Sequence, residues 1–161
     1  MAIWYTNDDI FNSYCQTLVN TVNCQGVMGK GLAKQFKQRF PIMYQQYCMA
    51  CKNWELKDGG DLWLYNYGLN QGILFEDNDV MQKRHTKILC FATKKHWMFK
   101  SRYEWIERGM DEFVAKYKEW GIESIAFPKL GCTNGGLDWD KVKDIMIPRL
   151  EKCDINVEIH I

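Results

Sequence analysis

The sequence has little proline, little histidine and almost no net charge. It contains 3 prolines and 3 histidines, and its 21 lysine and arginine residues nearly balance its 20 acidic residues. The resulting net charge of +1 lacks the strongly basic balance that is typical of proteins binding nucleic acid without specificity. A local site for an anion remains compatible with this charge, because backbone N–H groups can hold a phosphate without cationic side chains.

Long apolar runs and targeting signals are also missing from the sequence. No apolar stretch approaches the length of a membrane span, and the first residues lack the basic and apolar regions of a signal peptide. The 7 cysteines are odd in number and scattered, which is typical of reduced thiols. Cys48 and Cys51 form a CxxC pair without a second pair at zinc spacing. We therefore expect a cytoplasmic protein without a membrane partner, a metal ion or a cofactor.

The length and the composition are those of one globular domain. The chain has 161 residues, of which 47% are hydrophobic and 25% are charged, and it contains no internal repeat, low-complexity tract or linker. We expect a single domain over residues 1–161, and we expect it to be a monomer.

Strand-like and helix-like segments alternate along the chain. Helical spacing of apolar residues predicts helices over residues 31–40 and 44–54, a third between a Ser101–Glu104 capping box and Gly121, and a fourth capped by Asp138. Apolar stretches predict strands over residues 3–5, 18–23, 62–67, 87–91, 122–128 and 155–161, while residues 76–87 form a polar excursion. This alternation predicts a layered α/β fold with a largely parallel sheet.

Two glycine-rich loops each follow a predicted strand and precede a predicted helix. The first runs from Asn20 to Gly31 and the second from Pro128 to Asp138. Glycine allows the backbone to approach a ligand closely, and the N–H groups of a following helix would point into the loop. Neither loop matches G-x-x-x-x-G-K-[ST] or G-x-G-x-x-G, which excludes these two nucleotide-binding motifs. One such loop alone is more often only a tight turn, but two in matching positions favour a diphosphate held from both sides.

Three separated motifs resemble those of macro domains. The stretch from Leu18 to Lys37 resembles the first ligand loop of that family, and it is closest to the DarG-type antitoxin macrodomains and the terminal ADP-ribose protein glycohydrolases. The segments Phe91–Trp97 and Pro128–Trp139 are similar to the second and third signatures of this branch. The resemblance extends over nearly the whole chain and implies a three-layer α/β/α macro domain with a mixed, largely parallel central sheet. Such a domain would bind ADP-ribose or an ADP-ribosylated DNA or protein.

The resemblance also implies a set of ligand-binding residues. Asp9 would accept a hydrogen bond from the adenine amino group, with help from the backbone of Ile10, and Asn20 and Asn23 would line the distal ribose. Glycine-rich backbone from both loops would enclose the diphosphate. The implied set is Asp9, Ile10, Asn20, Asn23, Gly26, Val27, Met28, Gly29, Gly31, Leu32, Leu130, Gly131, Cys132, Thr133, Asn134, Gly135 and Gly136.

Lys94 is the residue that the resemblance singles out for catalysis, together with Asn20. In the similar glycohydrolases the lysine of a Thr-Lys motif is catalytic, and here that motif is Thr93-Lys94. A neutral amine could attack the anomeric carbon, which requires a lowered pKa that burial or the adjacent Lys95 could supply. An ammonium could instead stabilise or protonate the departing group. The sequence leaves both roles open, and by composition alone Lys94 would be one more exposed lysine.

One departure from the family pattern leaves the activity open. The protein-directed glycohydrolases carry a catalytic aspartate in the third motif, where this chain has Thr133 to Gly136 without a carboxylate. The pattern is therefore closer to relatives that remove ADP-ribose from DNA bases, and we expect an ADP-ribosyl hydrolase that works without a metal ion. The alternatives are a reader that binds ADP-ribose without turnover and a phosphatase acting on ADP-ribose 1″-phosphate. Lys94, Lys95, Lys100 and Arg102 form a basic patch that could meet a DNA phosphate or simply face solvent.

Overall fold

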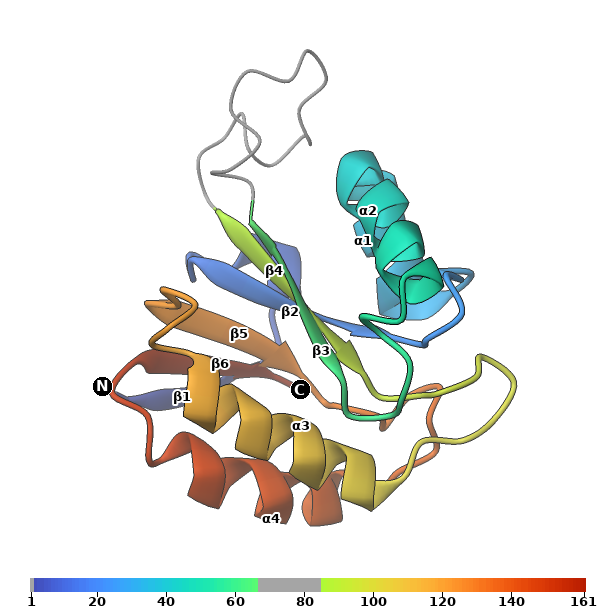
Figure 1. The fold of residues 1–161 in the computed structure, drawn as a ribbon. Coiled ribbons are helices and arrows are strands. Elements are labelled where there is room, and N and C mark those ends of the chain that lie inside the picture. The colour runs from blue at the N-terminus through green and yellow to red at the C-terminus, as the bar shows by residue number, and fades with distance from the viewer. Residues whose placement is uncertain (1, 67–84) are drawn as a thin grey trace.

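The computed structural model describes residues 2–66 and 85–161 and shows three layers. A six-stranded sheet lies in the middle, with α1 and α2 on one face and α3 and α4 on the other (Figure 1). This arrangement confirms the predicted α/β fold with its mixed sheet. The end of the predicted strand at residue 67 and most of the polar excursion over residues 76–87 lie outside the described residues.

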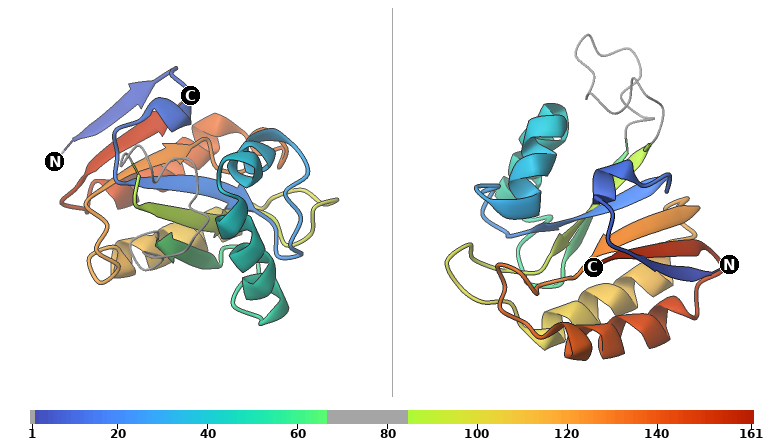
Figure 2. Two further views of the ribbon diagram at one scale, coloured as in Figure 1. Left: turned by 90° about the horizontal axis from the view of Figure 1, so that it is seen from above. Right: turned by 180° about the vertical axis from the view of Figure 1, so that it is seen from behind.

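The sheet brings the carboxyl ends of most of its strands together at one edge. Its strands are β1 (Ile3–Thr6), β2 (Thr17–Val22), β3 (Leu62–Asn66), β4 (Lys87–Ala92), β5 (Ser124–Pro128) and β6 (Asn156–His160), in the order β1-β6-β5-β2-β4-β3. All neighbouring pairs are parallel except β3 with β4. The carboxyl ends of the five parallel strands therefore meet at the same edge, which is where ligands bind in open α/β sheets. Figure 2 shows β1 and β6 side by side, with α3 and α4 covering one face of the sheet.

The helices lie close to their predicted positions. They are α1 (Gly31–Arg39), α2 (Pro41–Lys52), α3 (Tyr103–Lys116) and α4 (Trp139–Leu150), and a 3-10 turn, η1 (Ile10–Asn12), follows β1. The second helix starts at Pro41, three residues earlier than expected, because proline suits the first position of a helix, where its missing N–H would have no partner. Within the described residues no helix has the length and hydropathy to cross a membrane.

The core is divided into two layers by the sheet. On β2, Leu18 and Val22 point toward α1 and α2, where they pack with Phe36, whereas Val19 packs on the other side with residues of α3 and α4. This alternation follows from the two-residue period of a strand. Since both faces are covered, the strand is buried along nearly its whole length, including its polar residues Thr17 and Asn20.

The predicted capping box at the start of α3 is wrong. The N-cap residue is Arg102, without a side-chain cap, and Glu104 pairs with Arg102 across 3.3 Å instead of reaching back to the helix start. Ser101 is buried against the second glycine-rich loop, where its backbone N donates to the carbonyl oxygen of Gly135 at 3.0 Å. The tertiary contact with Gly135 thus takes the place of the local cap. The helix also ends at Lys116, before Gly121.

Candidate active site

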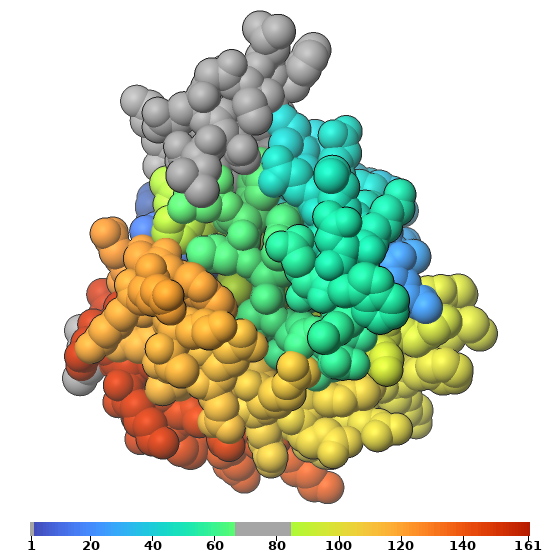
Figure 3. Space-filling model, viewed as in Figure 1, coloured from blue at the N-terminus to red at the C-terminus, as the bar shows by residue number. Residues whose placement is uncertain are grey.

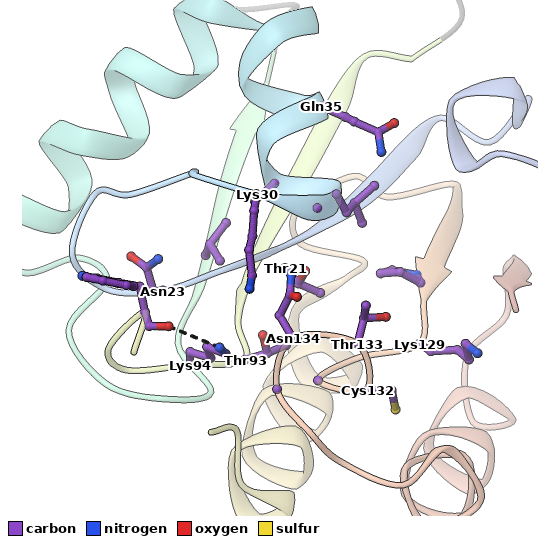
Figure 4. A pocket seen from close by; sticks show the side chains of 18 of the residues that line it. Thr21, Asn23, Lys30, Gln35, Thr93, Lys94, Lys129, Cys132, Thr133 and Asn134 are labelled. Carbon is purple, nitrogen blue, oxygen red and sulfur yellow. Dashed lines mark hydrogen bonds between the residues drawn. The ribbon is translucent and has the colours of Figure 1, made fainter. Parts of the chain in front are cut away.

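A cavity of about 880 Å³ lies at the edge where the parallel strands end (Figure 4). This volume is within the range of sites that enclose a small molecule. Its walls come from five parts of the chain that are far apart in the sequence. The lining residues are Asp9, Ile10, Thr21, Val22, Asn23, Val27, Gly29, Lys30, Gly31, Leu32, Ala33, Gln35, Thr93, Lys94, Trp97, Met98, Pro128, Lys129, Gly131, Cys132, Thr133, Asn134, Gly135 and His160.

The first glycine-rich loop forms one wall and is held in shape by Asn23. The Asn23 side chain donates from Nδ2 to the carbonyl oxygen of Val27 at 2.8 Å and accepts at Oδ1 from the backbone N of Gln25 at 2.9 Å. The loop ends at Gly31, whose φ of +62° is a left-handed conformation that favours glycine. No side chain caps α1 at Lys30, so the N–H groups of its first turn remain available to an anion in the cavity.

The second glycine-rich loop forms the opposite wall. Gly131 has a φ of +72°, and a Cβ atom on Gly31 of the first loop would come within 2.8 Å of Asn134 Nδ2, so the two loops approach each other closely. Asp138 caps α4 as predicted, accepting from the backbone N of Lys141 at 3.2 Å. Since this cap already satisfies the start of α4, the wall here consists of loop residues and not of a helix terminus.

Lys94 lies on the cavity wall, two residues after the end of β4. Its Nζ donates to the carbonyl oxygen of Trp97 at 3.3 Å (Figure 4). Burial lowers the pKa of Lys94 below its ordinary value, and the nearby Lys30 ammonium lowers it further. Lys95, the neighbour in sequence that we expected to have this effect, instead pairs with Asp58 at 3.6 Å. The cation that perturbs Lys94 therefore comes from the first ligand loop.

The charges that line the cavity are mostly positive. Lys30, Lys94 and Lys129 contribute three cationic groups, whereas Asp9 is the one carboxylate among the described lining residues. The Asp9 side chain accepts from the backbone N of Phe11 at 3.0 Å, which fixes its position at the start of η1. This balance of charge, together with the open first turn of α1, suits an anionic ligand. No carboxylate of the third motif lines the cavity in the described structure.

Five of the residues implied by the resemblance do not line the cavity. Asn20 is fully buried behind the first loop, with its Nδ2 at 3.8 Å from Met28 Sδ, and its Oδ1 has no hydrogen-bond partner in the described part of the chain. The other four belong to the two glycine-rich loops but do not face the cavity. They are Gly26, Met28, Leu130 and Gly136. The structure brings the remaining implied residues together around the cavity, and their roles toward a ligand stay predictions.

Comparison with known proteins identifies the family. The model of the Macro domain family matches residues 19–71 and 79–146, which is most of the chain. The chain belongs to the Macro domain family. This confirms the resemblance read from the three motifs.

Three of the matches show the kind of macro domain that this chain resembles. A DNA ADP-ribosyl transferase-DNA ADP-ribosyl glycohydrolase fusion protein from Thermosipho africanus is 40% identical over 95% of this chain and 40% of the relative. The structure of the macrodomain of Mycobacterium tuberculosis DarG is 36% identical, with a TM-score of 0.84 over 99% of this chain and 97% of that one. The structure of Thermosipho africanus DarTG in complex with ADP-ribose is 41% identical, with a TM-score of 0.85 over 98% of this chain and 41% of that one. The chain spans about 40% of the length of the curated relatives it matches.

Several residues that line the cavity of this macro domain were not predicted from the sequence. Lys30 lies inside the first motif, but it was not among the residues assigned to the ligand. Lys129 directly follows β5 and His160 ends β6, so a search of every strand end on this edge of the sheet would have found both. Trp97 and Met98 had no such signal, because their position depends on the path of the loop after β4.

The end of β4 is clamped by an interaction network around Asp61. The backbone N of Gly60 donates to the carbonyl oxygen of Ala92 at 2.7 Å, and Ala92 N donates to the Asp61 carbonyl at 2.9 Å. The Asp61 carboxylate accepts from Arg108 on α3 at 2.5 Å and from the backbone N of Lys57 at 3.0 Å. Because Ala92 stands two residues before Lys94, this network holds the backbone from which the Lys94 side chain extends.

Replacing Asp61 with asparagine is expected to destabilise this macro domain at neutral pH and to have a smaller effect in acid. Burial raises the pKa of Asp61, but hydrogen bonds from the Lys57 and Asp58 backbone and from Arg108 outweigh it and hold the pKa below its ordinary value of 3.8. Because the pKa of Asp61 is lower in the folded state, its ionised carboxylate stabilises the fold above pH 4. This contribution is lost as the pH falls through the folded pKa. We expect a loss of about 1–3 kcal/mol at pH 7 in denaturant melts. A difference between the two proteins that stays constant down to pH 3 would contradict this explanation.

Proposed function

We propose that this macro domain binds ADP-ribose in the cavity and hydrolyses the glycosidic bond that joins it to a base in DNA. The observation that carries the proposal is Lys94, a lysine with a lowered pKa on the wall of a cavity whose two glycine-rich loops suit a diphosphate. The relatives at 36–41% identity support the substrate class, since their names and structures specify DNA ADP-ribosyl glycohydrolases and bound ADP-ribose.

The distribution of groups around the cavity supports one orientation of the ligand. The adenine would lie beside Asp9 and Ile10, at the end formed by the loop after β1. The diphosphate would lie between the first turn of α1 and the loop that contains Gly131, where Lys30 can neutralise charge (Figure 4). The distal ribose would then lie toward Lys94, which puts its anomeric carbon next to the amine.

Hydrolysis breaks the bond between the anomeric carbon and the base, and the elements of water are added across it. The hydroxyl group goes to the carbon and the proton goes to the base. As a neutral amine, Lys94 would bond to the anomeric carbon first and be released by water; as an ammonium, it would donate the proton to the departing base. The lowered pKa of Lys94 assists both routes, because it increases the neutral fraction and makes the ammonium a stronger acid.

Replacing Lys30 with glutamine is expected to move the pH dependence of the rate. Without the Lys30 charge, the pKa of Lys94 rises toward its ordinary value, so the pH at which Lys94 titrates moves upward. If the amine is the working form, the rate rises with pH and the variant needs a higher pH to reach its plateau. If the ammonium is the working form, the rate falls with pH and the variant retains activity to a higher pH. The sign of the slope therefore distinguishes the two roles.

The matched control for Lys30 is Lys129→Gln. This change removes another lysine from the same cavity, on the opposite wall, but Lys129 is not among the causes of the Lys94 shift. We expect Lys129→Gln to change the level of the pH–rate profile without moving it along the pH axis. Equal displacement in both variants would mean that the total charge of the cavity, and not the Lys30–Lys94 pair, sets the pKa.

The direct test is single-turnover release of ADP-ribose from a single-stranded oligonucleotide modified on thymidine. We expect the wild-type domain to release ADP-ribose at the same rate with and without EDTA. Light scattering of the same sample should show a monomer. Absence of release over a long incubation with excess protein would refute the glycohydrolase. Loss of release on adding EDTA would show that a metal ion takes part.

A reader without turnover is the second candidate function. It is favoured because Thr133 to Gly136 of the third motif contain no carboxylate, and because the Asp9 carboxylate already accepts from the backbone N of Phe11. Calorimetry with ADP-ribose separates the cases: tight binding with no release from DNA or from modified protein would establish the reader. Absence of any binding heat at high ligand concentration would exclude both functions.

A further inference from the structure

A second hollow, of about 640 Å³, lies behind the segment that follows Lys94. Four of its lining residues carry a positive charge and three carry aromatic rings, and none is an aspartate or glutamate. The lining residues are Cys24, Gln25, Lys57, Lys95, His96, Phe99, Lys100, Ser101, Arg102 and Trp105. None of these residues lines the main cavity, so the hollow is a separate surface feature.

The segment 96–99 is a thin wall shared by the two spaces. Trp97 and Met98 line the main cavity, whereas His96 and Phe99 line the second hollow. The His96 and Phe99 rings lie 5.0 Å apart, and Phe99 is 65% exposed. In the space-filling view the yellow region that includes this segment stands out from the edge of the molecule (Figure 3). A chain leaving the main cavity near Lys94 would therefore reach the second hollow after crossing one turn of backbone.

Two of the charged groups of the hollow form exposed ion pairs, and one of the two also lies over an aromatic ring. The Arg102 guanidinium lies 5.4 Å from the centre of the Trp105 ring and pairs with Glu104 at 3.3 Å, with both partners about two-thirds exposed. Lys95 pairs with Asp58 at 3.6 Å, again with both partners at least half exposed. Such exposed pairs are weak, so a phosphate can compete for the cations.

We propose that the second hollow binds the single strand of DNA that continues from the modified nucleotide. Phosphates of the strand would be held by Arg102 and the neighbouring lysines, and a base would stack on the exposed ring of Phe99. A positively charged groove combined with aromatic platforms is how proteins bind single-stranded nucleic acid without reading its sequence. This proposal rests on the proposed function for the identity of the nucleic acid, and it adds a site that recognises the carrier strand and not ADP-ribose.

The test compares two affinities in a Lys94→Ala background, in which the substrate is not consumed. One ligand is free ADP-ribose. The other is a single-stranded oligonucleotide of about 12 nucleotides, within the size range of strand-binding sites, with one ADP-ribosylated thymidine. We expect the oligonucleotide to bind more tightly than ADP-ribose. Phe99→Ala and Arg102→Gln should each weaken oligonucleotide binding roughly tenfold while leaving ADP-ribose affinity unchanged. Arg102→Gln should also reduce the slope of log affinity against log salt by about 0.7.

Two matched controls separate the hollow from general effects of charge and exposed rings. Lys118→Gln removes a cation just beyond the other end of α3, where Lys118 likewise lies over an aromatic ring, at 5.9 Å from Tyr117, and pairs with Asp154 at 3.5 Å. Tyr14→Ala removes a ring that is 83% exposed and lies outside both cavities. Neither control should change the affinity for the modified oligonucleotide.

The proposal is overturned if Phe99→Ala and Arg102→Gln bind the oligonucleotide as tightly as the parent protein. It is also overturned if an ADP-ribosylated peptide shows the same dependence on Phe99 and Arg102, since the hollow would then serve a protein substrate. These are binding measurements, so they remain decisive if the wild-type domain fails to release ADP-ribose. Failure of release would refute the glycohydrolase. Equal oligonucleotide affinity of the variants and the parent protein would instead refute the strand site.

Discussion

Lys94→Ala is expected to slow the release of ADP-ribose from modified DNA by at least about 100-fold, the usual contribution of a positioned acid, base or nucleophile. Lys94 lies on the cavity wall, and its Nζ makes one described hydrogen bond, to the Trp97 carbonyl at 3.3 Å. Little of the fold depends on the Lys94 side chain beyond that bond, so the variant should fold normally. Single-turnover release with enzyme in excess measures the chemical step separately from affinity, and a thermal melt checks the fold.

Lys94→Arg is the stringent companion to this variant. Arginine keeps the positive charge but stays protonated at all accessible pH values, so it can act neither as a neutral amine nor as a proton donor. We expect it to be as slow as Lys94→Ala. Wild-type rates in Lys94→Arg would show that the residue acts only through its charge, and wild-type rates in Lys94→Ala would remove Lys94 from the mechanism.

Gly135→Ala is expected to weaken ADP-ribose binding at least tenfold, or about 1.4 kcal/mol. A Cβ atom at Gly135 would overlap the Ser101 side chain and the carbonyl oxygen of Gly131, and neither can move without changing the loop that lines the cavity. Ser101 cannot simply withdraw, since its backbone N is bonded to the Gly135 carbonyl. Overpacking of this kind typically costs about 1–3 kcal/mol, so the variant should also melt earlier. Calorimetry with ADP-ribose measures the affinity directly.

Gly29→Ala provides the matched control in the opposite wall. Gly29 also lines the cavity, but a Cβ atom there would meet only the Val27 side chain, at an ordinary 3.6 Å, and its φ is not positive. The same substitution should therefore leave the stability unchanged. If Gly29→Ala and Gly135→Ala lower the melting temperature equally, close packing against Ser101 is not what requires glycine at residue 135.

Some of the site could not be predicted because local patterns compete with tertiary contacts. The Ser101 and Glu104 pair has the spacing of a capping box, yet the approach of the Gly135 loop buries Ser101 and leaves Arg102 at the cap. For Lys94, the sequence suggested Lys95 as the perturbing cation because it is adjacent in the chain. Pairing of Val22 with Ala92 in the sheet instead places the loops after β2 and β4 together, and Lys30 belongs to the first of these loops.

Asn20 is a different case, because its burial follows from a rule that the sequence already contains. It alternates with Leu18 and Val22, which both point into the core beneath α1 and α2, so a strand of period two directs Asn20 to the same face. Its position behind Met28 could therefore have been predicted, whereas the resemblance alone placed it at the ribose.

The sequence by itself determined the features that depend on neighbouring residues. Strand and helix periodicity, the Asp138 cap and two glycine-rich loops following strands are all local, and together they predicted a layered α/β fold with a site at the loop ends. Only the tertiary structure decided which side chains share that site. Lys30 meets Lys94, Lys129 and His160 join the wall, and Phe99 with Arg102 opens a second hollow, because strand pairing and loop paths bring together residues that no spacing along the chain connects.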